Sequence, residues 1–172
     1  MSETLTTPVA AQALLGRHAR AVDHIAIAVH DLEAAIKLYS ETFGYQLFER
    51  RRTEGKASAM ISAVMKAGPI TIVLLQGTSE ESQVSRYVKH YGPGVQHIAI
   101  EVDDLQATTD ELTAAGVQFD TNIISSPGLR QIFTHRDENS GMMYEFIQRM
   151  GGDFSDESVK NLFEQLEAKN NF

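Results

Sequence analysis

The stretch Val22–Ala34, VDHIAIAVHDLEA, returns 73 residues later at Val95–Ala107 as VQHIAIEVDDLQA. Nine of the thirteen positions are identical, and His24 and His97 are one of the matching pairs. A repeat this close indicates that one structural module is built twice. Because the histidines hold the same place in both copies, the two modules could direct matching imidazoles at one shared point. That arrangement would suit a metal ion.

Each copy opens with the alternation that is typical of a β-strand. Ile25 and Ile27 fall on one face, whereas His24 and the alanines after it fall on the other. Helices are expected over residues 31–42 and 104–115, because an aspartate can cap each start and apolar residues then recur at helical spacing. The remaining expected strands cover residues 45–50, 59–66 and 70–75 in the first copy, and 118–121, 129–135 and 142–148 in the second.

This order of elements predicts an α+β fold. Two tandem βαβββ modules would form a cup-shaped mixed sheet around a metal site, and a C-terminal helix near residues 157–169 would pack over an opening or an edge. The expected units are an N-terminal leader (1–20), a first module (21–77), a linker with a short helix at 81–90 (78–93), a second module (94–150) and the C-terminal helix region (151–172).

The composition limits the class of protein. Of the 172 residues, 42% are hydrophobic and 22% charged, as in ordinary globular domains, and no apolar run is long enough to span a membrane. The net charge of −8 argues against nucleic acid as the main partner, and the basic cluster at 50–52 is expected to be solvated surface. The absence of cysteine excludes disulfides and thiolate ligands. With no secretory signal at the start, we expect a cytoplasmic protein that binds neither nucleic acid nor a membrane.

The stretch MMYEFIQ at residues 142–148 is an apolar strand with one carboxylate, Glu145. A glutamate buried alone is costly unless it is paired, protonated or bound to a metal. A cation between His24, His97 and Glu145 would remove that cost, and two histidines with one carboxylate describe a non-haem Fe(II) facial triad. The same ligands could hold Zn, Mn or Co. The ordinary alternatives are hydrogen-bonded core histidines and an edge-strand glutamate that faces water.

The matching strand of the first module, ITIVLL at residues 70–75, offers no ligand. Gln76, at its end, is the only polar candidate. We therefore expect three protein ligands rather than four, which leaves positions for a substrate and O2.

Five segments, VDHIAIAV, GPGVQHIAIEVDDL, LRQIFTH, YEFIQR and NLFEQLE, together resemble the vicinal oxygen chelate superfamily. Within it, they are most similar to the catalytic half of 4-hydroxyphenylpyruvate dioxygenase and hydroxymandelate synthase, over about residues 20–168. The resemblance implies that the three ligands named above bind Fe(II), with Co, Mn or Zn as alternatives, and that no catalytic side chain exists beyond them. It also matches four positions to residues that contact the substrate or order the pocket: Ser62, Gln83, Gln131 and Phe133.

The chain departs from that family in its substrate pocket. Where the family has Asn-Glu-Pro after the third strand, this sequence has Leu75-Gln76-Gly77. Where the final helix of the family begins with Asn-Phe, it has Ser158-Val159. The large N-terminal domain of those dioxygenases also has no counterpart in this sequence. We therefore do not expect 4-hydroxyphenylpyruvate itself to be the substrate.

Three functions remain open. The resemblance favours an Fe(II)-dependent dioxygenase in which a small 2-oxo acid or related substrate chelates the metal and O2 takes the remaining position. A divalent-metal epimerase or isomerase resembling methylmalonyl-CoA epimerase is the second, but that pattern requires a fourth ligand and a base. A metal-free small-molecule-binding protein of the antibiotic-resistance type is the third. Two-module chains of this kind commonly pair, so we expect a homodimer.

Overall fold

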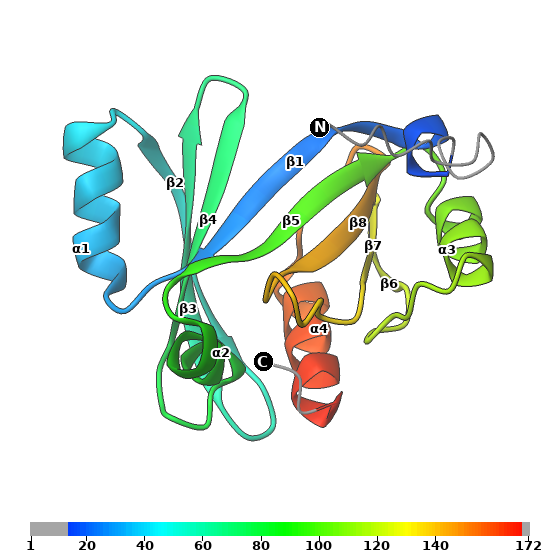
Figure 1. Cartoon of the computed structure of the whole chain (residues 1–172). Coiled ribbons are helices and arrows are strands. Elements are labelled where there is room, and N and C mark those ends of the chain that lie inside the picture. Colours follow the sequence, from blue (N-terminus) through cyan, green and yellow to red (C-terminus); the bar gives the residue numbers. More distant parts are fainter. Residues whose placement is uncertain (1–13, 170–172) are drawn as a thin grey trace, which may run out of the picture.

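The two repeated stretches form neighbouring strands at the centre of one curled sheet (Figure 1). The structure is a computed structural model that describes residues 14–169. Its eight strands follow the order β2-β3-β4-β1-β5-β8-β7-β6, so each half of the sheet comes from one half of the chain. The pairs β1–β4 and β5–β8 are parallel and the others are antiparallel. The predicted mixed sheet of two βαβββ units is confirmed.

The elements occur in nearly the same order in both halves. A short 3₁₀ turn (Leu15–Arg17) precedes the first half, which comprises β1 (Ala19–Ala28), α1 (Leu32–Lys37) with a π-helical extension (Leu38–Thr42), β2 (Gln46–Glu54), β3 (Ala59–Ala67) and β4 (Ile70–Gly77). Helix α2 (Gln83–Tyr91) connects the halves. The second half comprises β5 (Gly94–Val102), α3 (Leu105–Ala114), β6 (Ile124–Ser126), β7 (Leu129–Phe133) and β8 (Met143–Arg149), and α4 (Asp156–Lys169) follows.

Side chains of the sheet complete the start of each module helix. Asp31 caps α1 as predicted, since its carboxylate accepts a 2.9 Å hydrogen bond from the Ala34 N–H. In addition, Gln76 Oε1 accepts a bond from the Leu32 N–H at 2.6 Å, and Gln148 does the same for α3. These bonds satisfy backbone donors that have no partner within the helix. Gln76 thus faces the helix side of the sheet, away from the histidines.

The alternation in β1 separates two packing layers, as the sequence predicts. Ile25 and Ile27 pack against the cluster that holds Leu32 and Ile36 of α1. Ala26 and Ala28 lie on the opposite, concave face and are fully buried. These small side chains leave space beside the neighbouring imidazoles.

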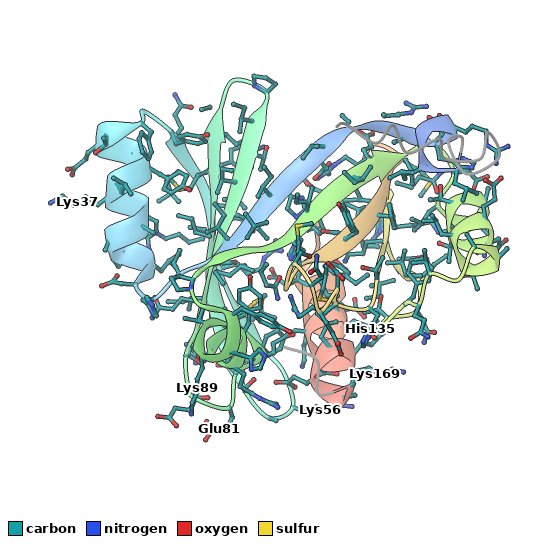
Figure 2. All side chains as sticks on the ribbon, viewed as in Figure 1. Lys37, Lys56, Glu81, Lys89, His135 and Lys169 are labelled. Carbon is teal, nitrogen blue, oxygen red and sulfur yellow. The ribbon has the colours of Figure 1, made fainter. Side chains whose placement is uncertain are left out.

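Helix α4 joins the two ends of the curled sheet. It contacts both β2 and β6, which are the edge strands (Figure 1). Phe163 packs in a cluster with residues of the first half, and Leu166 packs with Phe133 of the second. Glu167 accepts hydrogen bonds from Lys56 N, Ala57 N and Ser58 Oγ in the loop between β2 and β3 (Lys56 is labelled in Figure 2). The predicted C-terminal helix therefore packs over the open side of the sheet, where apolar contacts and hydrogen bonds hold it.

Two local predictions need correction. The expected strand at 118–121 is only a single bridge between Phe119 and Thr134, because the Thr121 hydroxyl takes the Phe133 N–H that a longer ladder would use. The short edge strand β6 forms instead. Strand β2 runs past Arg50 to Glu54, so the basic cluster lies within it. Most of the expected leader, residues 1–13, lies outside the described residues, and β1 already begins at Ala19. Among the described helices, none is long and apolar enough to cross a membrane.

Candidate metal centre

His24, His97 and Glu145 lie on three adjacent strands of the concave face. His97 pairs with Ala26 across β1–β5, and Glu145 pairs with Ala99 across β5–β8. Each therefore has an alanine beside it, and the three buried side chains converge above these alanines. The structure thus brings together the three residues that the sequence singled out.

The distances between their polar atoms suit one small cation. The two Nε2 atoms are 3.4 Å apart, and Glu145 Oε2 lies 3.2 Å from His24 Nε2 and 3.6 Å from His97 Nε2. Ligand atoms that share an ion at bonds of about 2.0–2.2 Å are themselves about 3.0–3.4 Å apart. The triangle needs little adjustment to accept a divalent ion.

The second oxygen of Glu145 supports the same fit. Glu145 is only 1% exposed, and its Oε1 atom has no hydrogen-bond partner. Leaving a buried carboxylate oxygen unsatisfied is costly, so the site is incomplete as protein alone. Two imidazoles and a carboxylate are also the donor set that iron, zinc, manganese and cobalt accept. The residues present therefore fit a divalent metal.

The electrostatics of the two histidines differ. Burial lowers the pKa of His24, but the charges of Glu145 and Asp23 more than offset this and raise it to about 9. Burial and the charges of His24 and Arg136 lower the pKa of His97 well below its ordinary value. Without a metal, His24 is thus the charged imidazolium at neutral pH, whereas His97 is neutral.

A cavity of about 330 Å³ opens in front of the three candidate ligands. Its apolar wall comes from both halves of the sheet, from α4 and from the segment before α4: Phe48, Met60, Val64, Val73, Leu75, Phe133, Phe154, Val159 and Leu162. Charged side chains also line it, namely Asp23, Glu49, Arg51, Lys66, Arg149 and Asp153. Arg51 is held by Glu49 and Asp156 and hydrogen-bonds the Phe154 carbonyl, so it is not free to bind an anion.

Three of the four predicted substrate contacts line this cavity. Ser62 comes from β3, and Gln131 and Phe133 share one face of β7. Gln131 is fully buried, and neither its amide nitrogen nor its carbonyl oxygen has a protein partner. Phe133 packs edge-on against the His97 ring, with the ring centroids 5.1 Å apart. Gln83 is buried in the first turn of α2 and is not among the residues that line the cavity.

Sequence reasoning missed four residues at this site. Asp23 contacts His24, and Arg149 contacts Asp23. Phe154 packs edge-on against His24, with the centroids 5.8 Å apart. Arg51, taken for surface, lines the cavity. The available signals were the charged residue next to His24 and the arginine that ends the YEFIQR strand.

Comparison with known proteins agrees with this fold. The family model of the glyoxalase/bleomycin resistance protein/dioxygenase superfamily matches residues 23–127. The chain is 32% identical over 151 residues to 4-hydroxyphenylpyruvate dioxygenase of Pseudomonas aeruginosa, covering 66% of this chain and 42% of that protein. It is 30% identical over 132 residues to ethylmalonyl-CoA/methylmalonyl-CoA epimerase of Cereibacter sphaeroides, covering 74% of this chain and 96% of that protein.

A solved structure shows the same fold. A variant of 4-hydroxymandelate synthase from Streptomyces coelicolor superposes with a TM-score of 0.79 at 24% identity, covering 89% of this chain and 55% of that one. Because the family model matches more than half of the chain, the chain belongs to the glyoxalase/bleomycin resistance protein/dioxygenase superfamily. Its relatives include both dioxygenases and epimerases, and it spans less than half the length of the dioxygenase above.

Proposed function

We propose that the protein is an Fe(II)-dependent dioxygenase that acts on a small 2-oxo acid with an apolar side chain. The observation that carries this proposal is the set of three convergent ligands found among the described residues, beside a cavity with an apolar wall. His24, His97 and Glu145 would hold the metal. When bound, Fe(II) would supply Lewis acidity and the electrons needed to activate O2.

The remaining cavity residues would bind and orient the substrate. The unpartnered amide of Gln131 can hydrogen-bond a carboxylate or carbonyl oxygen, which would relieve its own unsatisfied burial. Phe133 and the aliphatic side chains around it would pack on the substrate's hydrocarbon part. Val159 and Leu162 of α4 would cover that part and exclude water.

The position of Val73 favours the dioxygenase over the epimerase. Parallel pairing places Val73 opposite Ala26 of β1, just as Glu145 lies opposite Ala99 of β5. A fourth ligand from the first module would stand where this valine lies. A metal held by three protein groups keeps more positions open for a chelating substrate and O2.

The epimerase remains the second candidate because of one observation: the chain covers 96% of the length of its epimerase relative. For that reaction, a carboxylate in the cavity would have to move the proton. Glu49 lines the cavity but is paired with Arg51 at 2.6 Å, which leaves it poorly suited as a base.

The test is O2 uptake by anaerobically purified protein loaded with Fe(II), with aromatic and aliphatic 2-oxo acids as substrates. We expect one CO2 released for each O2 consumed, with one oxygen atom in the new carboxylate and the other in the rest of the product. Glu145→Gln should abolish uptake, whereas His135→Gln, which changes an exposed histidine outside the metal triad (labelled in Figure 2), should retain it. Deuterium exchange into an acyl-CoA ester with Co²⁺, without O2 uptake, would identify an epimerase instead. Failure to bind any divalent metal would refute both enzymes and leave a binding protein.

A further inference from the structure

The residue before each candidate ligand histidine is an extra residue in its strand. Strands β1 and β5 pair in a register that skips Asp23 on β1 and Gln96 on β5. The register also skips Arg20 near the start of β1, but the bulges at Asp23 and Gln96 are the pair that lies 73 positions apart, as the repeat does. In a regular strand, the residue before each histidine would place its side chain on the opposite face of the sheet, and a bulge changes that orientation. Both bulges therefore turn a polar side chain toward the histidine face.

Each bulge residue contacts the Nδ1 atom of the histidine that follows it in the sequence. Asp23 Oδ1 lies 2.8 Å from His24 Nδ1, and Gln96 Oε1 lies 2.5 Å from His97 Nδ1. Amide and carboxylate oxygens accept hydrogen bonds, so both Nδ1 atoms must donate. The two Nε2 atoms are then the ones that can offer lone pairs to a cation at the shared point.

The two acceptors are unequal, because only Asp23 is charged. Arg149 is the last residue of β8, the strand that carries Glu145. It donates two hydrogen bonds to the Asp23 carboxylate in a bidentate contact, with Nε 2.5 Å from Oδ2 and Nη2 3.1 Å from Oδ1. Burial would raise the pKa of Asp23, but the hydrogen bonds from His24 and Arg149 hold it well below its usual range.

Arg149 is itself fixed by the segment that leads into α4. It donates hydrogen bonds to the Gly152 carbonyl at 3.3 Å and to Asp153 Oδ1 at 3.1 Å. The centroid of the Phe154 ring lies 5.4 Å from the guanidinium carbon of Arg149. Gly152 has no room for a side chain, since a Cβ there would lie 2.0 Å from the Pro127 carbonyl oxygen. The guanidinium therefore has a defined place from which to orient Asp23.

We propose that Asp23 and Gln96 are positioning residues that fix both ligand histidines in the Nδ1–H form, and that Arg149 locks Asp23 in the orientation this requires. The inference rests on the metal site of the proposed function, but it holds for either candidate reaction. Partners that orient a ligand histidine typically change metal affinity by 10–100-fold.

The experiment compares Zn²⁺ and Co²⁺ binding by calorimetry in the unmodified protein, Asp23→Asn and Arg149→Met. Asp23→Asn keeps the size of the side chain but replaces one oxygen that Arg149 holds with an amide that cannot accept. Asp103→Asn is the matched control, because Asp103 also pairs with an arginine of β1, Arg20, but is exposed and outside the cavity. After correction for the proton that the metal displaces from His24, we expect about 10–100-fold weaker binding in both site variants and no more than about a twofold change in the control.

A second readout follows the ring nitrogens directly. Long-range ¹H–¹⁵N correlation spectra of the Zn²⁺-loaded protein should show both histidines bound through Nε2, with the proton on Nδ1. In Arg149→Met, the His24 signals should shift and broaden while those of His97 stay in place. Unchanged affinity and unchanged His24 signals in folded variants would overturn the inference, as would coordination through Nδ1. Absence of metal binding by the unmodified protein would instead refute the proposed function.

Discussion

Lowering the pH should weaken metal binding far more steeply than ordinary histidine ligands allow. A metal can bind His24 only through a deprotonated Nε2, and burial, Glu145 and Asp23 together set the pKa of His24 at about 9 in the metal-free protein. The metal must therefore displace a proton throughout the neutral range. His97 adds nothing to this dependence, because its lowered pKa leaves it neutral there.

The magnitude follows from the fraction of His24 that is deprotonated. With a pKa of about 9, this fraction falls from about 1 in 11 at pH 8 to about 1 in 1,000 at pH 6, so affinity should fall about 90-fold. With the ordinary histidine pKa of about 6.5, the same drop from pH 8 to pH 6 would lower the metal affinity only about fourfold. The direction is fixed: protons compete with the metal, so affinity rises with pH until it levels off above about 9.

Calorimetry with Co²⁺ at pH 6, 7 and 8, in buffers that do not bind metal, measures this directly. Repeating each titration in buffers of different ionisation enthalpy counts the protons released, and we expect about one per metal at pH 7. A fourfold or smaller loss between pH 8 and pH 6, or no proton release, would show that Glu145 and Asp23 do not raise the pKa of His24.

Three further changes probe the metal, the helix start and the closing helix. Zn²⁺ at a hundred times its Kd should raise the free energy of unfolding in urea by about 2.7 kcal/mol, and EDTA should reverse this; Glu145→Gln should show no such gain. Gln76→Met should lower the free energy of unfolding by about 1–2 kcal/mol, because the Leu32 N–H loses its acceptor. If this variant binds Zn²⁺ as tightly as the unmodified protein, Gln76 is not a ligand. Glu167→Ala removes three hydrogen bonds to the β2–β3 loop and should cost about 1–3 kcal/mol in the same assay, so an unchanged unfolding midpoint would argue against this anchor.

The parts of the fold that local pattern determines could be predicted from the sequence. Alternation places Ile25 and His24 on opposite faces, and the repeat places His97 where His24 stands. Glu145 stands out because the apolar strand MMYEFIQ contains no other carboxylate. These three features are sufficient to predict the triad before any tertiary contact is known.

The surroundings of the triad depend on strand register, which sequence pattern does not reveal. Strict alternation assigns Asp23 to the isoleucine face, and only the bulge in β1 turns it toward His24. Arg51 has the appearance of a solvated residue in a basic cluster, and only the curl of the sheet brings it to the cavity. Gln76 was a possible ligand by its polarity, but it faces the helix layer because its neighbour Leu75 faces the cavity.

The contrast between Val73 and Glu145 has a stereochemical consequence. Had the sheet been assembled from two identical chains, a twofold axis would have forced the same residue into both positions. Within one chain the two halves differ in sequence, so the candidate metal centre has the carboxylate of Glu145 on one side and the aliphatic side chain of Val73 at the matching position on the other. In the proposed dioxygenase, a chelating substrate would therefore bind this pocket in one orientation, so a prochiral carbon would be attacked on a single face and the product would be of one hand.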